Sequence, residues 1–173
     1  IYMNSSKEKI VQKMINEDSL SIKALNEMIQ SSIIIDNALN SLAYQGLSVE
    51  TINEHLKEIS TAQENFSNYD KSFTAIKIEG DGKAKYDIVK ENWSQLAESL
   101  SKQLTIFAKG KPTPAEYESY HPYYESNLEP KLTSMHENLE FIIDYNEKSI
   151  LEEKHSYEQT EKLSQVVIYG SVA

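Results

Sequence analysis

Residues that break regular secondary structure are rare in this chain and are concentrated at a few positions. The 173 residues include 5 glycines and 4 prolines, most of them near residues 46, 80–82 and 110–114. Between these positions, apolar residues recur at alternating steps of three and four, which places their side chains on one face of an α-helix. The pattern predicts an all-α fold with turns near Gly46, Gly80 to Gly82, and Gly110 to Thr113.

Four long helical segments follow from these turns. The first is expected over residues 5–44, and the second begins after Ser48 as an N-cap and extends to about residue 76. The third is expected over residues 86–107, and the fourth from Thr113 to about Ile168. Long helices joined by short turns predict an up-down-up-down antiparallel four-helix bundle, a single domain over residues 1–173 with long first and last helices.

The last helix carries two prolines and a polar seam. Pro122 and Pro130 each remove a backbone donor, so a kink or break is expected there. Toward the C-terminus the core-facing positions become polar, at Asn146, Ser149 and Glu153. This end is expected to be either loosely packed or frayed.

Composition excludes several function classes. The net charge of −10 disfavours binding to nucleic acids and to anionic lipid surfaces. All 17 basic residues are lysines, so no guanidinium can clamp a carboxylate or phosphate. Cysteine is absent, and no apolar run approaches the roughly 20 residues of a membrane-spanning helix.

Two Glu-x-x-His pairs are candidate metal ligands, Glu118 with His121 and Glu152 with His155. They lie on the same predicted helix, about 50 Å apart at 1.5 Å per residue, and so cannot meet within one subunit. No nucleophile-base pattern or glycine-rich phosphate loop is present. We therefore expect no catalytic residue, no metal and no cofactor, and a protein that is not an enzyme.

The turn before the last helix carries a family resemblance. Phe107 ends one helix near Gly110, and Lys111-Pro112-Thr113 then leads into a very long final helix. This arrangement resembles the extracytoplasmic four-helix sensor domain of bacterial methyl-accepting chemotaxis receptors of the aspartate and serine type. The resemblance implies the periplasmic or extracellular part of a cytoplasmic-membrane protein, a homodimer, and signalling by displacement of the last helix. Flanking transmembrane helices outside this chain would be its only contact with the membrane.

Two alternative functions remain open. The same kind of bundle occurs as the sensor domain of membrane histidine kinases, and only the sequence that follows it would distinguish the two. A helical scaffold or adhesion bundle without any ligand is the alternative of a different class.

The resemblance also implies a ligand site. Three family arginines correspond to Ser32, Asn37 and Ser41, so the clamp for an amino-acid carboxylate is missing. Thr113 matches the family's ligand-contacting threonine, and Phe107 lies near its aromatic position. The polar positions could hold a small polar ligand or serve as register-fixing interface residues, and a periplasmic binding protein docking at the distal tip is a further option. The implied ligand-binding residues are Ser32, Asp36, Asn37, Asn40, Ser41, Phe107, Thr113 and Tyr117.

The first helix contains a run of three isoleucines. Ile33, Ile34 and Ile35 point in nearly every direction around the helix, so part of this surface faces away from a single bundle core. A second copy of the chain is the simplest partner. The predicted dimer interface comprises Ile29, Ile33, Ile34 and Ile35.

Overall fold

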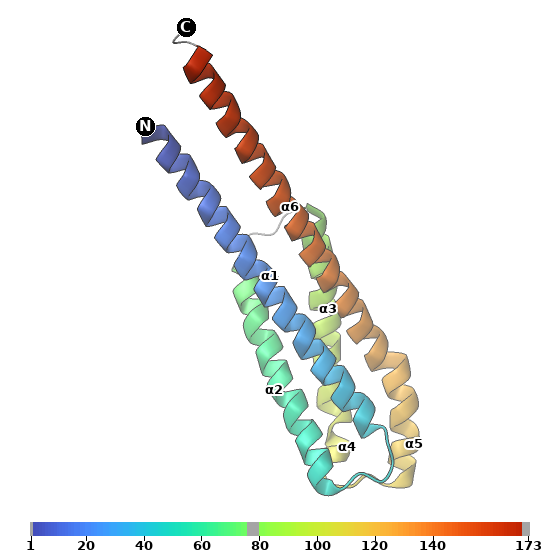
Figure 1. The fold of residues 1–173 in the computed structure, drawn as a ribbon. Coiled ribbons are helices and arrows are strands. Elements are labelled where there is room, and N and C mark those ends of the chain that lie inside the picture. The colour runs from blue at the N-terminus through green and yellow to red at the C-terminus, as the bar shows by residue number, and fades with distance from the viewer. Residues whose placement is uncertain (1, 76–79, 171–173) are drawn as a thin grey trace.

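The computed structural model is an all-helical bundle, in agreement with the predicted fold (Figure 1). It describes residues 2–75 and 80–170, with side chains for residues 12, 16–75, 80–160 and 162. No β-strand occurs in this described part of the chain. In chain order the elements are α1 (Tyr2–Leu42), α2 (Val49–Thr74), α3 (Gly80–Gln103), α4 (Thr105–Ala108), α5 (Pro114–Tyr123), the π-helical turn η1 (Tyr124–Leu128) and α6 (Glu129–Gly170).

The two longest helices of the bundle are α1 and α6, and they pack against each other. α1 packs against α2 on one side and α6 on the other, while α3 packs against α6. Both chain ends lie at the same end of the molecule, where α1 and α6 extend beyond α2 and α3 (Figure 1). We call the opposite end, which holds α4 and the start of α5, the distal tip. None of the described helices is long and apolar enough to cross a membrane.

The core is a continuous apolar seam in which aromatic rings link neighbouring helices. Phe66 of α2 stacks on Trp93 of α3 with ring centroids 4.0 Å apart, and Phe73 meets Tyr86 edge-on at 4.6 Å. Such pairs contribute roughly 0.5–1.5 kcal/mol beyond the burial of their area. They fix the register of α2 against α3.

The turns lie near the predicted glycines, with two corrections to the helix bounds. Gly46, Gly80 and Gly110 have backbone φ values of 95°, 61° and 107°, which residues with a Cβ rarely adopt. Gly80 already begins α3, so Asp81 and Gly82 are helical and not part of a turn. The third predicted helix does not run unbroken to residue 107, because it ends at Gln103 and a short helix follows.

The last predicted helix continues through both prolines as α5, η1 and α6, and the interruption expected near the prolines takes the form of the π-helical turn. Pro122 lies inside α5 and Pro130 in the first turn of α6, and the chain between them forms η1. The polar seam beyond them is helical, because α6 continues to Gly170, and its first member Asn146 is paired through a 3.0 Å hydrogen bond donated to Ser21 of α1. The α1–α6 contact therefore reaches at least as far as Ser21 and Asn146.

Candidate functional site

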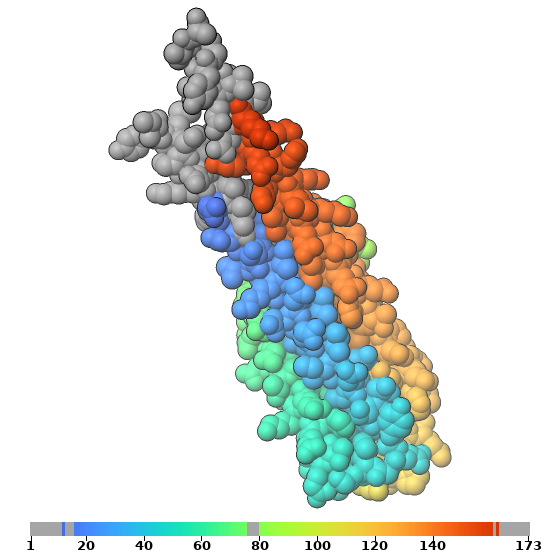
Figure 2. Space-filling view, viewed as in Figure 1, coloured from blue at the N-terminus to red at the C-terminus, as the bar shows by residue number. Residues whose placement is uncertain are grey.

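A groove follows the seam between α1 and α6. Two adjoining hollows, of about 250 and 550 Å³, share Ile33, His136 and Glu140. Figure 2 shows the surfaces of α1 and α6 side by side along this seam. The remaining lining residues are Asn26, Ile29, Gln30, Ser32 and Asp36 on α1, and Leu132, Thr133, Glu137, Ile143 and Asp144 on α6.

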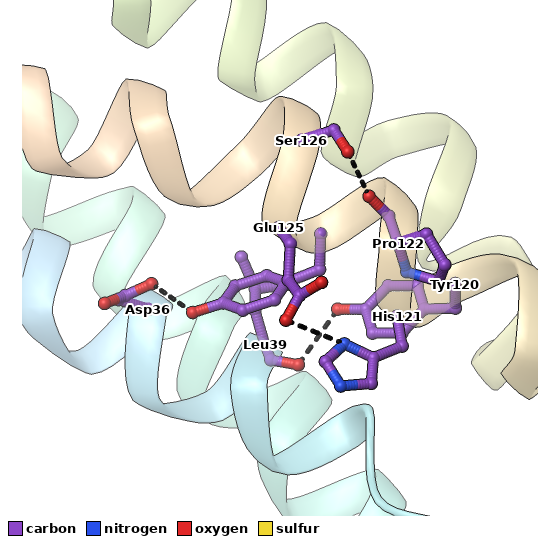
Figure 3. Close-up of polar contacts among 8 residues, drawn as sticks. Asp36, Leu39, Tyr120, His121, Pro122, Glu125 and Ser126 are labelled. Carbon is purple, nitrogen blue, oxygen red and sulfur yellow. Dashed lines mark hydrogen bonds and ion pairs between the residues drawn. The ribbon is translucent and has the colours of Figure 1, made fainter.

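The α1 wall of the groove combines a buried hydroxyl with a carboxylate. Ser32 is buried, and its hydroxyl donates a 2.8 Å hydrogen bond to the carbonyl of Ile29. Asp36 is half-buried and accepts a 2.8 Å hydrogen bond from the hydroxyl of Tyr124 (Figure 3). Burial, together with the neighbouring Asp36 carboxylate, raises the pKa of Tyr124 above its usual value. Tyr124 therefore remains a neutral donor at physiological pH.

A second tyrosine binds α1 one turn further toward the distal tip. The hydroxyl of Tyr120, a buried residue of α5, donates a 3.0 Å hydrogen bond to the backbone carbonyl of Leu39 (Figure 3). Burial raises the pKa of Tyr120, so it too stays protonated. Two hydroxyls on successive turns thus connect the α5–η1 segment to the last third of α1.

The α6 wall is acidic. His136 and Glu140 contact each other at 3.1 Å, and Glu137 lies between them in the sequence. The described residues that line the two hollows include four carboxylates and no lysine. This charge favours neutral or cationic ligands over anions. Within the described residues, no three histidine, aspartate or glutamate side chains are grouped so that they could hold a metal ion.

Only two of the eight predicted ligand residues, Ser32 and Asp36, line this groove. Asn37 and Asn40 are exposed on the outer face of α1. Ser41 is half-buried, and its hydroxyl donates to the carbonyl of Asn37 at 2.8 Å. These three residues therefore lie beside the groove, not in it.

The other three predicted ligand residues lie at the distal tip. Phe107 and Tyr117 are buried and meet edge-on, with ring centroids 6.1 Å apart. The Tyr117 hydroxyl is buried without a hydrogen-bond partner. Thr113 caps α5 in a reciprocal capping box with Glu116, so its hydroxyl is already engaged. These three residues do not line the α1–α6 groove.

The four predicted dimer residues divide between the core and the surface. Ile29 and Ile35 are 7% and 0% exposed and pack in the chain's own core. Ile33 is half-buried in the α1–α6 groove, while Ile34 is 43% exposed and lines a groove of about 520 Å³ between α1 and α2. Only Ile33 and Ile34 therefore offer surface to a second copy.

Sequence reasoning did not predict η1 or the roles of Tyr120 and Tyr124, although the sequence carries a signal for them. The buried positions Tyr120, Tyr124, Leu128 and Leu132 follow at three successive steps of four residues. At about 100° per residue, these twelve residues would turn a regular α-helix about 120° past three full turns. A π-turn accommodates one extra residue, so all four side chains can face the core.

No protein-family model matches the chain, and neither a curated protein nor a solved structure is significantly similar to it. The structure itself shows the class of domain: it is an all-helical four-helix domain whose long first and last helices form a polar, acidic groove.

Proposed function

We propose that the chain is the extracytoplasmic ligand-sensing domain of a transmembrane chemotaxis receptor. The observation that carries this proposal is the α1–α6 pair. Both helices leave the bundle at the same end, and a groove with polar groups lies on the seam between them (Figure 1). A ligand in this groove touches both helices, so its binding energy can change their relative position.

The proposed ligand is small and polar. Hydroxyl groups of Ser32 and Thr133 and the Asp36 carboxylate offer hydrogen-bonding atoms beside the apolar side chains of Ile33 and Leu132. A hollow of about 250 Å³ lies just below the usual range of about 300–1,000 Å³ for ligand pockets, which favours a small ligand. Since the walls are acidic, a dicarboxylate such as aspartate is a poor candidate.

The proposed working unit is a homodimer formed through α1. Between Met28 and Val49, the only charged residue is Asp36, in a chain of which 25% is charged. Each copy of the chain carries a net charge of −10, so two copies repel each other least where they meet through a surface with few charged residues. Ile33 and Ile34 lie within this stretch and supply the apolar contact.

A thermal-shift screen of small polar and cationic metabolites tests the sensing function. A ligand that binds only the folded state raises the melting temperature, by an amount that grows with its concentration. Asp36→Asn should reduce the shift, whereas Asn53→Asp, which changes an exposed residue of α2, serves as the matched control. If no compound or purified periplasmic binding protein changes the melting temperature, a ligand-free scaffold becomes the better description.

A further inference from the structure

The rod formed by α5, η1 and α6 contains one residue more than its core pattern needs. From Tyr117 to Ile142 the buried positions are separated by steps of 3, 4, 4, 4, 3, 4 and 3 residues. Removal of any one residue between Tyr124 and Leu128 would change these steps to a strict alternation of 3 and 4. That alternation is the spacing at which a regular α-helix keeps one face on its neighbours. The π-turn therefore takes up the surplus residue, and a chain shortened by one residue here could bury the same side chains in a regular α-helix.

Side chains as well as backbone groups bond to the carbonyls of this segment. The N–H of Glu129 reaches back five residues to the carbonyl of Tyr124, as in a π-helix. Ser126 donates to the carbonyl of Pro122 at 2.6 Å, and Asn127 donates to the carbonyl of Tyr123 at 3.3 Å. These side-chain hydrogen bonds lie on exposed or half-buried groups, where hydrogen bonds open more readily than in the buried part of a helix.

The extra residue lies directly beside the polar contact to α1. Tyr124 is the first residue of η1, and its hydroxyl holds the Asp36 carboxylate that lines the groove. Figure 3 shows Asp36 facing this segment, with Pro122 and Ser126 on the same stretch of the rod. A change in the hydrogen bonding of η1 therefore moves a side chain that bonds to α1.

We propose that η1 is a hinge in the last helix and that the Tyr124–Asp36 hydrogen bond is the latch that keeps it closed. When the latch opens, the extra residue lets α5 and α6 turn relative to each other while the apolar core stays packed. The hinge is a property of the free chain, so it stands or fails independently of the proposed ligand-sensing function.

Single-residue deletions test whether the π-turn holds a surplus residue. Deletion of Ser126 should leave a stably folded protein, with a melting temperature within about 4 °C of the parent or above it. Deletion of Glu64, an exposed residue between the buried Ala62 and Phe66 of the straight helix α2, is the matched control. This deletion turns the buried residues of α2 on one side of position 64 away from the core. The melting temperature should therefore fall by more than about 10 °C. If both deletions are equally damaging, the surplus residue does not exist.

Hydrogen exchange on the parent protein tests the hinge itself. Backbone amides of residues 126–133 should exchange faster than those of residues 135–142 in the same rod, and deletion of Ser126 should slow them to the rate of the latter group. Equal protection of the two segments in the parent would rule the hinge out.

Paired tyrosine variants test the latch. Tyr124→Phe removes the hydroxyl that bonds to Asp36 and should speed amide exchange across residues 124–133. Tyr123→Phe changes the adjacent residue, whose hydroxyl makes no hydrogen bond within the described part of the chain, and should leave these amides unaffected. Unchanged exchange in Tyr124→Phe would show that this hydrogen bond does not hold the hinge.

Discussion

The hydroxyl of Tyr120 donates a 3.0 Å hydrogen bond to the carbonyl of Leu39, a residue 81 positions earlier in the chain. In a helix that continued, this carbonyl would accept from Ala43, whose N–H donates instead to Asn40 at 3.0 Å. The tyrosine therefore pairs one of the carbonyls that the end of α1 leaves without a helical partner.

Tyr120→Phe should lower the free energy of unfolding by about 1–3 kcal/mol, because it leaves a buried carbonyl without a partner. Urea denaturation measures this change as a lower midpoint with an unchanged slope. Tyr44→Phe, at a position that is 65% exposed, is the control and should behave like the parent. Equal midpoints for all three proteins would show that water satisfies the Leu39 carbonyl.

The three consecutive isoleucines of α1 should respond differently to truncation. Ile35 is 0% exposed, so Ile35→Ala should cost about 2–5 kcal/mol of stability through the cavity it leaves. Ile34 is 43% exposed, so Ile34→Ala should cost less than about 1 kcal/mol in the monomer. Chemical denaturation at low protein concentration gives both values.

The same residues test the proposed dimer at high protein concentration. Ile34→Lys places a charge in the stretch of α1 that otherwise carries only Asp36. Analytical ultracentrifugation should show weaker self-association for this variant than for the parent, with the monomer fold intact by circular dichroism. A parent that remains monomeric at millimolar concentration contradicts the α1 interface.

The fold was predictable because the apolar period, the helix caps and the turn glycines each depend only on residues that are close together in the sequence. Ser48 and Thr113 form the N-caps expected from their residue types, and Gly46 and Gly110 have the positive φ expected at a helix end. The division of roles among Ile33, Ile34 and Ile35 was not predictable. Each differs from the next by about 100° around the helix, and only the positions of α2 and α6 decide which one is buried.

The candidate site was predictable only in part. Ser32 and Asp36 line the groove, but the partner of Asp36 is Tyr124, 88 positions away in the chain. The spacing of four between Tyr120, Tyr124 and Leu128 does indicate an anomaly in the helix. It carries no information about which α1 residue lies opposite, because that depends on the register between two helices.

Two carboxylates near the chain ends should make stability depend on pH. Burial raises the pKa of Asp18, with a further contribution from Glu17, and burial together with Asp18 raises the pKa of Glu153. Because both pKa values are higher in the folded state, the folded state binds protons first as the pH falls, and these two groups then cease to oppose folding.

Asp18→Asn and Glu153→Gln should therefore stabilise the protein at pH 7, and the difference from the parent should shrink toward about pH 4 as the parent's carboxyls protonate. Thermal unfolding over this pH range measures the difference. Comparison with the parent at each pH is necessary because the pKa of Glu116, which caps α5, is lowered and acts in the opposite direction. A difference that grows as the pH falls would contradict the assignment.

The cap of α5 should contribute to stability without any ligand. The Thr113 hydroxyl accepts a hydrogen bond from the N–H of Glu116, whose carboxylate in turn accepts a 2.7 Å hydrogen bond from the Thr113 N–H. Thr113→Ala should therefore lower the free energy of unfolding by about 0.5–2 kcal/mol. Thr113→Ser keeps the hydroxyl and should restore most of that loss, which identifies the cap as the cause.

Ligand binding should distinguish the groove from the distal tip once a ligand has been identified. Ser32 and Asp36 line the groove, whereas Thr113 lies at the tip, where its hydroxyl is engaged by Glu116. For a ligand in the groove, Asp36→Asn should weaken binding by about 1–3 kcal/mol, and by more if the ligand group is cationic. Thr113→Ala, which removes the threonine hydroxyl, should leave the affinity unchanged. Calorimetry on these two variants separates the alternatives, because a tip site contacting the threonine would give the reverse order of effects.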